Sequence, residues 1–344
     1  MSECFLYLSR ADVDRALALV DVLAVTAEAH RLHAEGLTTL PPESHLQWTT
    51  PRGHAARSLA MAGRLNSDSA PAGVKVINGS LGNVASGLPR ASGLTLLFDD
   101  ETAQVRCVLD AARISSVRTA ATSVLAFATF ARAPRATLTI VGAGVIGGAH
   151  LDLALAHVPQ LEAVCVADTD PARAHSLVQD RAEQLEAAGV VGEVLPIAEA
   201  VARGDFVVMA TTTTEPYVEH GWLRPDAIVS NVSLDDLKPE VFYEAQLLLV
   251  DDWTLVALDE HRLLGRLYRA GEIGAPGYSA NAVRRSVDGE LGAALNGSSA
   301  LRSKVADGGL VVLNPFGLAI EDIALAGAVE RVAHTQELGR WLER

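Results

Sequence analysis

The sequence predicts an α/β protein of two domains, in which a doubly wound parallel sheet follows an α+β domain. Short apolar runs alternate with helical stretches from about residue 137 onward, which is typical of parallel strands joined by helical crossovers. A glycine-rich turn at 142–148 lies in mid-chain, between an apolar run and a helical stretch. The chain has 344 residues, 49% of them hydrophobic, which is enough for two cores.

The first part of the chain predicts an antiparallel sheet with helices. It begins with a short strand at 5–8 and a long helix at 11–34, whose first turn carries carboxylates that favour a helix N-terminus. Strand-like runs separated by Gly, Pro and Asp-Asp turns follow at 58–62, 74–77, 94–98 and 104–109. A second long helix is expected over 110–132. The break at 133–135, which contains a proline, marks the domain boundary.

The second part predicts the parallel sheet, with a final helix that returns to the first domain. Strands are expected at 138–141, 163–167, 192–196, 206–210, 227–232, 246–250 and 310–313. The Gly- and Ser-rich segment 289–309 is expected to be a loop, and 318–342 a helix. One domain therefore comprises 1–132 plus 317–344, and 133–316 forms the other.

The glycine turn has the form of a Rossmann dinucleotide-binding unit. In that unit the first glycine permits the bend, the second admits the pyrophosphate and the third lets helix pack on strand. Asp168 ends the next apolar run, where a carboxylate accepts from both ribose hydroxyls and repels a 2′-phosphate. We therefore expect NAD as the cofactor. The expected contacts from this unit are Gly142, Gly144, Val145, Ile146, Gly147 and Asp168.

Composition excludes several classes of partner. The formal net charge of −14 argues against nucleic acid and against an anionic membrane surface. No apolar run reaches the roughly 18 residues of a membrane span, and the N-terminus lacks a signal-peptide pattern, so a cytoplasmic protein is expected. The three cysteines are expected to be small buried residues. The pair His30 and His33 has no further ligand nearby and indicates a solvated helix end, so no metal site is expected.

Lys75 stands out because lysine is rare in this chain. Only Lys75, Lys238 and Lys304 are lysines, so the other 25 of the 28 basic residues are arginines (28 − 3). Lys75 lies in an apolar strand, where it either faces a cleft or protects a sheet edge. Lysine, unlike arginine, loses its proton usefully when desolvated. The residues alone leave these two interpretations open.

Arginines and hydroxyls offer further binding candidates. Arg118 lies in a helix of small residues, which suggests bidentate capture of a carboxylate or phosphate, with hydroxyl donors from Thr119 and Thr122. An ion pair within the domain is the alternative. Arg57 and Arg90 are weaker candidates for binding substrate.

The carboxyl ends of two later strands carry polar residues. Thr211, Thr212 and Thr213 follow one strand, at the sheet edge where open α/β folds bind ligands. Ser233 and the pair Asp235 and Asp236 follow the next strand. Either aspartate is a candidate proton donor or acceptor, and either one alternatively caps the following helix.

Together these segments resemble the ornithine cyclodeaminase/μ-crystallin family over nearly the whole chain. The motifs that carry the resemblance are Gly73-Val-Lys75-Val, Arg118-Thr-Ala-Ala-Thr-Ser, the mid-chain glycine turn and Asn314-Pro-Phe-Gly-Leu-Ala-Ile-Glu-Asp322. Arg90-Ala-Ser-Gly, Ser230-Asn-Val-Ser and Val250-Asp-Asp-Trp253 are similar to the branch of the family that makes L-2,3-diaminopropionate. One departure is Ser233-Leu-Asp235-Asp236, where cyclodeaminases carry Gly-Gly-Asp-Cys-Pro-Gly-Lys.

The resemblance implies a function and roles for the candidates. It implies NAD-dependent oxidative cleavage of N-(2-amino-2-carboxyethyl)-L-glutamate to 2,3-diaminopropionate and 2-oxoglutarate, for siderophores or peptide antibiotics. Lys75 would polarise a carboxylate or activate water, Arg118 would hold a carboxylate near the pyrophosphate, and Arg57 and Arg90 would take the remaining carboxylates. Asp236 is placed as the catalytic carboxylate by its distance from Glu240.

The resemblance also implies partners and competing functions. The first domain would bind substrate and form a homodimer through its sheet, and a PLP-dependent synthase would supply the substrate from O-phosphoserine and glutamate. Ornithine cyclodeaminase, alanine dehydrogenase and ketimine reductase activities are the alternatives on the same scaffold. A crystallin-like binding protein without turnover is the alternative from another class.

Overall fold

The computed structural model describes residues 4–67, 71–80, 82–132, 134–278 and 283–344. The chain forms two compact units, one of residues 1–118 and 318–344 and the other of residues 119–317. We call these the first and second units. The sequence places the boundary near residue 133, which lies outside the described residues, whereas the contacts divide the chain within the long helix α4 (Ala111–Phe130).

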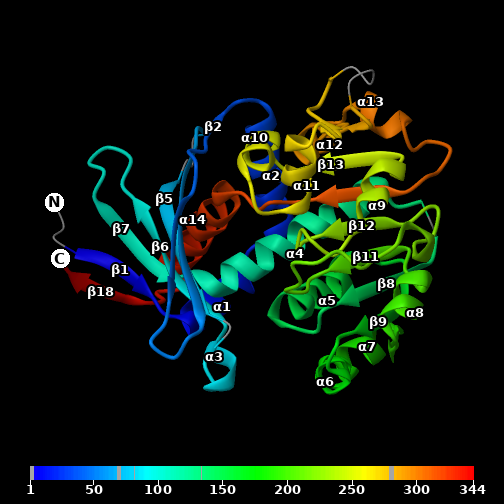
Figure 1. The fold of residues 1–344 in the computed structure, drawn as a ribbon. Coiled ribbons are helices and arrows are strands. Elements are labelled where there is room, and N and C mark those ends of the chain that lie inside the picture. The colour runs from blue at the N-terminus through cyan, green and yellow to red at the C-terminus, as the bar shows by residue number, and fades with distance from the viewer. Residues whose placement is uncertain (1–3, 68–70, 81, 133, 279–282) are drawn as a thin grey trace. The chain divides into compact units, whose positions relative to one another are not determined.

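The first unit is built around a sheet with the strand order β18-β1-β7-β6-β5-β4-β2, and β3 pairs with β4 (Figure 1). Its strands are β1 (Cys4–Leu8), β2 (Thr38–Thr39), β3 (Ser44–Thr49), β4 (Ala55–Leu65), β5 (Ala72–Ser80), β6 (Ala91–Phe98), β7 (Val105–Asp110) and β18 (Arg340–Glu343). Its helices are α1 (Arg10–Leu17), α2 (Val22–Ala34), α3 (Gly82–Ala85), the start of α4 and α14 (Ala319–Thr335).

Three expectations for this unit were wrong. The helix expected at 11–34 is two helices, because Asp21 caps α2 by accepting a hydrogen bond from the backbone of Ala24. The sheet is not wholly antiparallel, since β1 runs parallel to β7. The C-terminal helix ends at Thr335, and residues 340–343 form a strand antiparallel to β1.

The register of the first unit's sheet sorts its side chains onto two faces. Met61 pairs with Lys75, and Lys75 pairs with Thr95, so these three residues share one face. All three are buried. Helix α14 covers this face, because a side chain at Gly63 would meet Ile320 at 3.1 Å. The buried lysine therefore lies beneath α14.

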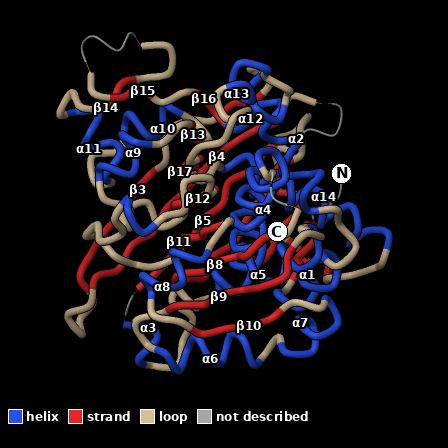
Figure 2. The backbone as a smooth tube through the Cα atoms, turned by 90° about the vertical axis from the view of Figure 1, so that its right-hand side faces the viewer, coloured by secondary structure: helices blue, strands red, loops and turns tan. Residues whose placement is uncertain are grey.

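The second unit contains a parallel sheet with the order β10-β9-β8-β11-β12-β17-β13-β16, whose strands lie side by side in Figure 2. Its strands are β8 (Ala136–Val141), β9 (Leu161–Ala167), β10 (Val191–Val194), β11 (Phe206–Met209), β12 (Ile228–Asn231), β13 (Leu247–Val250), β16 (Gly289–Glu290) and β17 (Val311–Asn314). A small separate sheet pairs β14 (Ile273–Gly274) with β15 (Arg285–Ser286). The seven predicted strands are all present, and the predicted α/β fold is confirmed.

Helices follow most strands of the second unit. They are the rest of α4, α5 (Val145–His157), α6 (Pro171–Gln179), α7 (Ala182–Ala188), α8 (Ile197–Arg203), the 3-10 helix η1 (His220–Trp222), α9 (Pro239–Glu244), α10 (Trp253–Leu258), α11 (Leu263–Arg269), α12 (Leu291–Leu295) and α13 (Ser299–Ser303). The segment 289–309, expected to be a loop, contains β16, α12 and α13. Within the described residues, no helix has the length and apolar character needed to cross a membrane.

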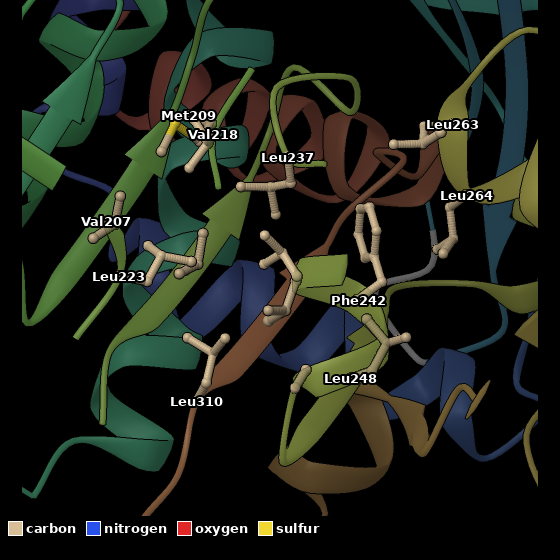
Figure 3. Close-up of a cluster of buried hydrophobic side chains, with 14 of the residues drawn as sticks. Val207, Met209, Val218, Leu223, Leu237, Phe242, Leu248, Leu263, Leu264 and Leu310 are labelled. Atoms are coloured by element: carbon tan, nitrogen blue, oxygen red, sulfur yellow. The ribbon is translucent and has the colours of Figure 1, made fainter. Parts of the chain in front are cut away.

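A large cluster of buried apolar side chains packs against the parallel sheet of the second unit. The cluster includes Val207 and Met209 from β11, Phe242 from α9 and Leu248 from β13, which Figure 3 draws with other members of the cluster between them. All four are 0% exposed. Strands buried in this way read as continuous apolar runs, which is why the sequence predicts them well.

Candidate functional site

The glycine turn of the second unit has the geometry that a dinucleotide needs. Gly142 follows β8 with φ +105°, a backbone conformation that other residues rarely adopt. A side chain there would lie 2.4 Å from the carbonyl oxygen of Ala210. At Gly147, on the first turn of α5, a side chain would lie 2.2 Å from the carbonyl oxygen of Gly142. Both positions therefore require glycine.

The start of α5 is free to bind an anion. Its N-cap residue, Gly144, provides no side-chain capping bond, so the first N–H groups are not satisfied by a cap. Val145 is 71% exposed, and Ile146 is half-buried beside it. An exposed valine at a helix N-terminus is the surface that a cofactor would cover. These residues fit a dinucleotide pyrophosphate.

Asp168 lies at the end of β9, directly beside this turn. One carboxylate oxygen accepts from the backbone N–H of Ala143 at 2.8 Å, and the other accepts from the N–H of Asp170 at 3.0 Å. The two bonds orient the carboxylate at the carboxyl end of the strand. This is the position from which an acidic residue reads a ribose.

Replacement of Asp168 by Ser is expected to weaken the preference for NAD. A hydrogen bond to a charged group contributes about 1.5–3 kcal/mol, so the Kd for NAD should rise by roughly 10- to 150-fold. The Kd for NADP should rise less or fall, because repulsion of the 2′-phosphate is removed. Fluorescence titration with both cofactors measures the two constants, and wild-type protein that binds NADP more tightly than NAD would contradict the role.

A second polar cluster lies after β11 and β12 and centres on Asp236. Thr211 donates its hydroxyl to Asp236 Oδ1 at 2.7 Å, Tyr217 donates to the same oxygen at 2.9 Å, and Ser233 donates to Oδ2. Asp236 is 0% exposed. Burial raises its pKa, and the three hydroxyl bonds oppose that rise. The cluster ties together the loops at the carboxyl edge of the sheet.

The adjacent Asp235 is held by different partners. Its oxygens accept from the backbone N–H of Leu263 at 2.7 Å and from the guanidinium of Arg262 at 3.1 Å, which anchors the start of α11. Neither aspartate is exposed. The catalytic role predicted for Asp236 stays a prediction.

The first unit contains a buried cluster of charged residues around Lys75. Lys75, on β5, donates to Asp322 Oδ2 on α14 at 2.6 Å. Arg118, near the middle of α4, reaches the same oxygen through Nε at 3.3 Å and donates to Glu321 Oε2 through Nη1 at 2.9 Å. Lys75 and Arg118 were predicted to act in one site, and the structure places both against α14.

His30 completes the cluster. Its Nε2 lies 2.7 Å from Glu321 Oε1, and both side chains are 0% exposed. The expectation of a solvated helix end was therefore wrong for His30, because this face of α2 packs against α14. His33 instead contacts the hydroxyl of Thr38 through Nδ1 at 2.7 Å.

The pKa of Lys75 is set by opposing effects of burial and of neighbouring charges. Burial in the sheet lowers its pKa, and the negative charge of Asp322 partly restores it. The positive charge of Arg118 lowers the pKa further, and the negative charge of Glu43 raises it. A buried lysine of this kind is typical of a functional site. The alternative interpretation of Lys75 as an edge protector is wrong, since β5 is an inner strand.

The other predicted arginines lie farther along the same sheet. Arg57 pairs with Gly79 on β5, two rows along from Lys75 and on the same face, and Gly79 pairs with Ala91. Arg90 directly precedes Ala91, so both arginines lie at one end of the sheet. Both are exposed. They are therefore separated from the buried cluster by about 13 Å along the strands, four residues at ~3.3 Å each.

The remaining candidates occupy two regions. Thr119 and Thr122 lie on α4, Thr119 half-buried and Thr122 buried. Thr211 and Thr213 form a turn in which the N–H of Thr213 donates to the Thr211 hydroxyl at 3.1 Å, with the exposed Thr212 between them. No group of three or more His, Cys, Asp or Glu side chains in the described part of the chain is arranged to hold a metal ion.

The two buried cysteines are poor candidates for a reactive thiol. Cys107 and Cys165 are buried, whereas Cys4 is only partly so. Burial raises the pKa of Cys107 to about 12 and that of Cys165 to about 11. Thiols with such pKa values are poor nucleophiles near neutral pH.

Sequence reasoning missed Glu321 and Asp322 as site residues. Both belong to the C-terminal motif, and the signal was present: two adjacent carboxylates interrupt the apolar run of α14, where every residue from Ala319 to Glu330 is buried. Buried carboxylates require partners. Their partners, however, come from elements far apart in the sequence.

Comparison with known proteins decides the family. A model of the ornithine cyclodeaminase/mu-crystallin family matches residues 5–337. The chain belongs to this family. One relative is the N-((2S)-2-amino-2-carboxyethyl)-L-glutamate dehydrogenase of Staphylococcus aureus, which is 32% identical over 99% of both chains. The alanine dehydrogenase of Archaeoglobus fulgidus is 26% identical over 97% of both chains.

Two solved structures show the same fold. The crystal structure of CmnK matches with a TM-score of 0.87 and 33% identity, over 99% of this chain and 98% of that one. An archaeal alanine dehydrogenase dimer with bound NAD matches with a TM-score of 0.81 and 24% identity, over 98% and 99% of the two chains. The predicted family resemblance is confirmed.

Proposed function

We propose that this protein catalyses the NAD-dependent oxidative cleavage of N-(2-amino-2-carboxyethyl)-L-glutamate to L-2,3-diaminopropionate and 2-oxoglutarate. At the coarser level it is an NAD-dependent amino-acid dehydrogenase, which two dehydrogenase relatives and an NAD-bound structural neighbour support. The observation that carries the proposal is the buried pair of Lys75 on β5 and Arg118 on α4, both held against carboxylates of α14, with Arg57 farther along the same sheet face. Several cationic groups suit a substrate with three carboxylates.

The proposed reaction balances with one water. Bound NAD supplies the hydride acceptor for the glutamate Cα–H. Loss of that hydride and of the amine proton leaves a C=N bond, to which water adds to give a carbinolamine. The C–N bond then breaks, the carbinolamine oxygen becomes the keto oxygen of 2-oxoglutarate, and the nitrogen leaves as the amine of 2,3-diaminopropionate.

The residues of the first unit supply binding and charge under this proposal. Arg118 holds a substrate carboxylate in a geometry that two carboxylates of α14 restrict. Lys75 carries a cationic or proton-accepting amine on the same face, where it polarises a carboxylate or accepts a proton from the attacking water. Arg57 and Arg90 bind the more distant carboxylates. Asp236 is proposed as a further proton-exchanging group.

The decisive experiment combines purified protein, NAD and N-(2-amino-2-carboxyethyl)-L-glutamate. We expect absorbance of reduced nicotinamide to rise, with equal amounts of 2,3-diaminopropionate and 2-oxoglutarate found by mass spectrometry. Ornithine and alanine, and a cyclic imine with NADH, are the matched substrates. If the proposed substrate is not turned over, the other substrates identify the activity. Ammonia and proline from ornithine would indicate a cyclodeaminase, pyruvate from alanine an alanine dehydrogenase, and reduction of the cyclic imine a ketimine reductase. Dinucleotide binding without any turnover would favour a binding protein.

We also propose a homodimer formed by the uncovered face of the first unit's sheet. Leu46 and Trp48 on β3 share this face with Val76 and Leu94, as the strand register requires. Leu46 is 62% exposed, Trp48 46% and Leu94 43%. An apolar sheet face of this kind marks an interaction surface. The dimeric archaeal alanine dehydrogenase of the same fold supports the assignment.

Replacement of Trp48 by Glu is expected to shift the protein from dimer to monomer. A charge in the centre of an apolar interface is desolvated without a partner, at a cost of several kcal/mol. Light scattering after size-exclusion chromatography measures the mass. Val191→Glu, at an exposed edge strand of the second unit, is the control that should stay dimeric. A monomeric wild-type protein would overturn the proposal.

The family resemblance extends the proposal to a place in metabolism. A PLP-dependent synthase that joins O-phosphoserine and glutamate would supply the substrate in the cytoplasm. The product would enter the synthesis of a siderophore or a peptide antibiotic.

A further inference from the structure

Two adjacent carboxylates on α14 have different partners. Asp322 contacts Lys75 Nζ at 2.6 Å and Arg118 Nε at 3.3 Å, both through Oδ2. Glu321 contacts Arg118 Nη1 at 2.9 Å and His30 Nε2 at 2.7 Å, and it also accepts from the backbone N–H of Leu318 at 3.0 Å. The bonds of Glu321 therefore tie α14 to α2 and α4. Asp322 is the carboxylate that joins the two basic groups.

The cluster is balanced in charge and closed to water. Lys75 is 1% exposed, Arg118 8%, and both carboxylates are 0% exposed. The two formal positive charges face two formal negative charges. Since a buried amine needs a partner to remain ionised, Lys75 depends on the carboxylate that it contacts.

We propose that Asp322 is the positioning residue that holds Lys75 and Arg118 in fixed relation and keeps Lys75 charged. Oδ2 accepts a hydrogen bond from Nζ of Lys75 and forms an ion pair with Nε of Arg118, so the two basic groups have a common anchor. The other oxygen, Oδ1, is buried and has no hydrogen-bond partner among the described residues. Within the described residues, the polar contacts of the Asp322 side chain are therefore with Lys75 and Arg118, the two groups that bind substrate under the proposed function.

The groups around Lys75 come from several elements. Asp322 lies on α14, Arg118 on α4 and Glu43 in the segment before β3, while Met61 and Thr95 flank it in the sheet. Of the acidic groups that act on Lys75, Asp322 has the largest effect, ahead of Glu43. Removal of its charge should therefore change the titration of Lys75 more than any other single substitution.

The scarcity of lysine makes this directly measurable. With only three lysines in the chain, lysine labelled with ¹³C and ¹⁵N at its side-chain end gives three ammonium signals by NMR. Lys238 and Lys304 are partly exposed and serve as internal references. Titration of the wild-type protein should show a pKa for Lys75 below the usual value of a lysine side chain, with Lys75 still charged at pH 7.

Asp322→Asn is expected to lower the pKa of Lys75 by at least one unit, a tenfold shift in its proton affinity, because the neutral amide no longer favours the ammonium form. Glu321→Gln, equally buried on the same helix, is the matched control and should shift Lys75 less. Asp322→Glu keeps the charge on a longer arm, so it should restore the titration towards wild type. Equal shifts in Asp322→Asn and Glu321→Gln, or no shift in Asp322→Asn, would overturn the proposal.

The wild-type protein provides a test that needs no variant to fold. If Lys75 is neutral at pH 7 in the wild type, Asp322 does not keep it charged, and the proposal fails. A charged Lys75 whose ammonium protons exchange more slowly with water than those of Lys304 supports it.

The role in turnover rests on the proposed function, and it is measured separately. Asp322→Asn should lower kcat at least tenfold. In a profile of kcat against pH, the limb that reports the titration of Lys75 should move to lower pH in Asp322→Asn and return towards its wild-type position in Asp322→Glu. An unmoved limb would contradict the positioning role. The NMR titration uses neither substrate nor NAD, so it holds or fails independently of whether the wild-type protein turns over N-(2-amino-2-carboxyethyl)-L-glutamate.

Discussion

Lys75→Met is expected to reduce kcat/KM by about 10²–10⁴-fold, the usual contribution of a positioned group that transfers a proton. Among the described residues of the buried cluster, Lys75 supplies the only amine. Methionine fills a similar space but carries no charge and donates no hydrogen bond. NAD binding should be unchanged, because the glycine turn belongs to the other unit. Steady-state kinetics and a cofactor titration measure the two effects.

The control for this variant is Lys238→Met, which removes an exposed lysine paired with Glu219. Loss of Lys75 also leaves Asp322 as a buried charge with Arg118 as its remaining contact, which destabilises the protein by up to ~3–5 kcal/mol. Thermal unfolding must therefore be measured alongside, and kinetics compared at a temperature where both variants are folded. Full turnover by folded Lys75→Met would refute the catalytic role.

Gly147→Ala is expected to weaken NAD binding by about 10- to 100-fold and to destabilise the second unit by about 1–3 kcal/mol. The added methyl group would lie 2.2 Å from the carbonyl oxygen of Gly142 and 3.0 Å from Ile140 Cγ2. The backbone must then move α5 away from β8. This displaces the N–H groups that would bind the pyrophosphate.

Two substitutions separate this clash from the general effect of replacing a glycine. Gly221→Ala has nothing within 4 Å of the added carbon, and it should bind NAD normally. Gly189→Ala has equally open space but a φ of +67°, so it should lose stability without losing affinity. Calorimetric NAD titration and thermal unfolding distinguish the three. If Gly147→Ala binds as tightly as Gly221→Ala, the close approach of helix and strand is not required.

The second unit was well predicted because its signals are local. A strand buried on both faces is a continuous apolar run, and the glycines of the turn are required by contacts within a few residues or one strand away. The prediction of a loop at 289–309 was wrong because its local composition was misleading. Its Gly and Ser residues resemble a loop, but Leu291, Leu301 and Val305 are buried there, and packing orders the segment.

The first unit was predicted less well because its sheet depends on distant pairings. The break between α1 and α2 was signalled by Asp21, yet the continuous helical periodicity concealed it. Strand β18 pairs with β1 from the opposite end of the chain. A short exposed segment such as 340–343 has little periodicity of its own, so only the available edge of β1 makes it a strand.

The candidate site shows the same division. The sequence by itself determined the α/β fold and the glycine turn followed by Asp168, and it predicted Lys75 and Arg118 as site residues, because each rests on residue type and local pattern. Only the tertiary structure decided their partners. Lys75 meets Asp322 across 247 residues, and Arg118 meets Glu321 across 203. A buried charge must be paired, but which carboxylate pairs it depends on how α14 packs against the sheet.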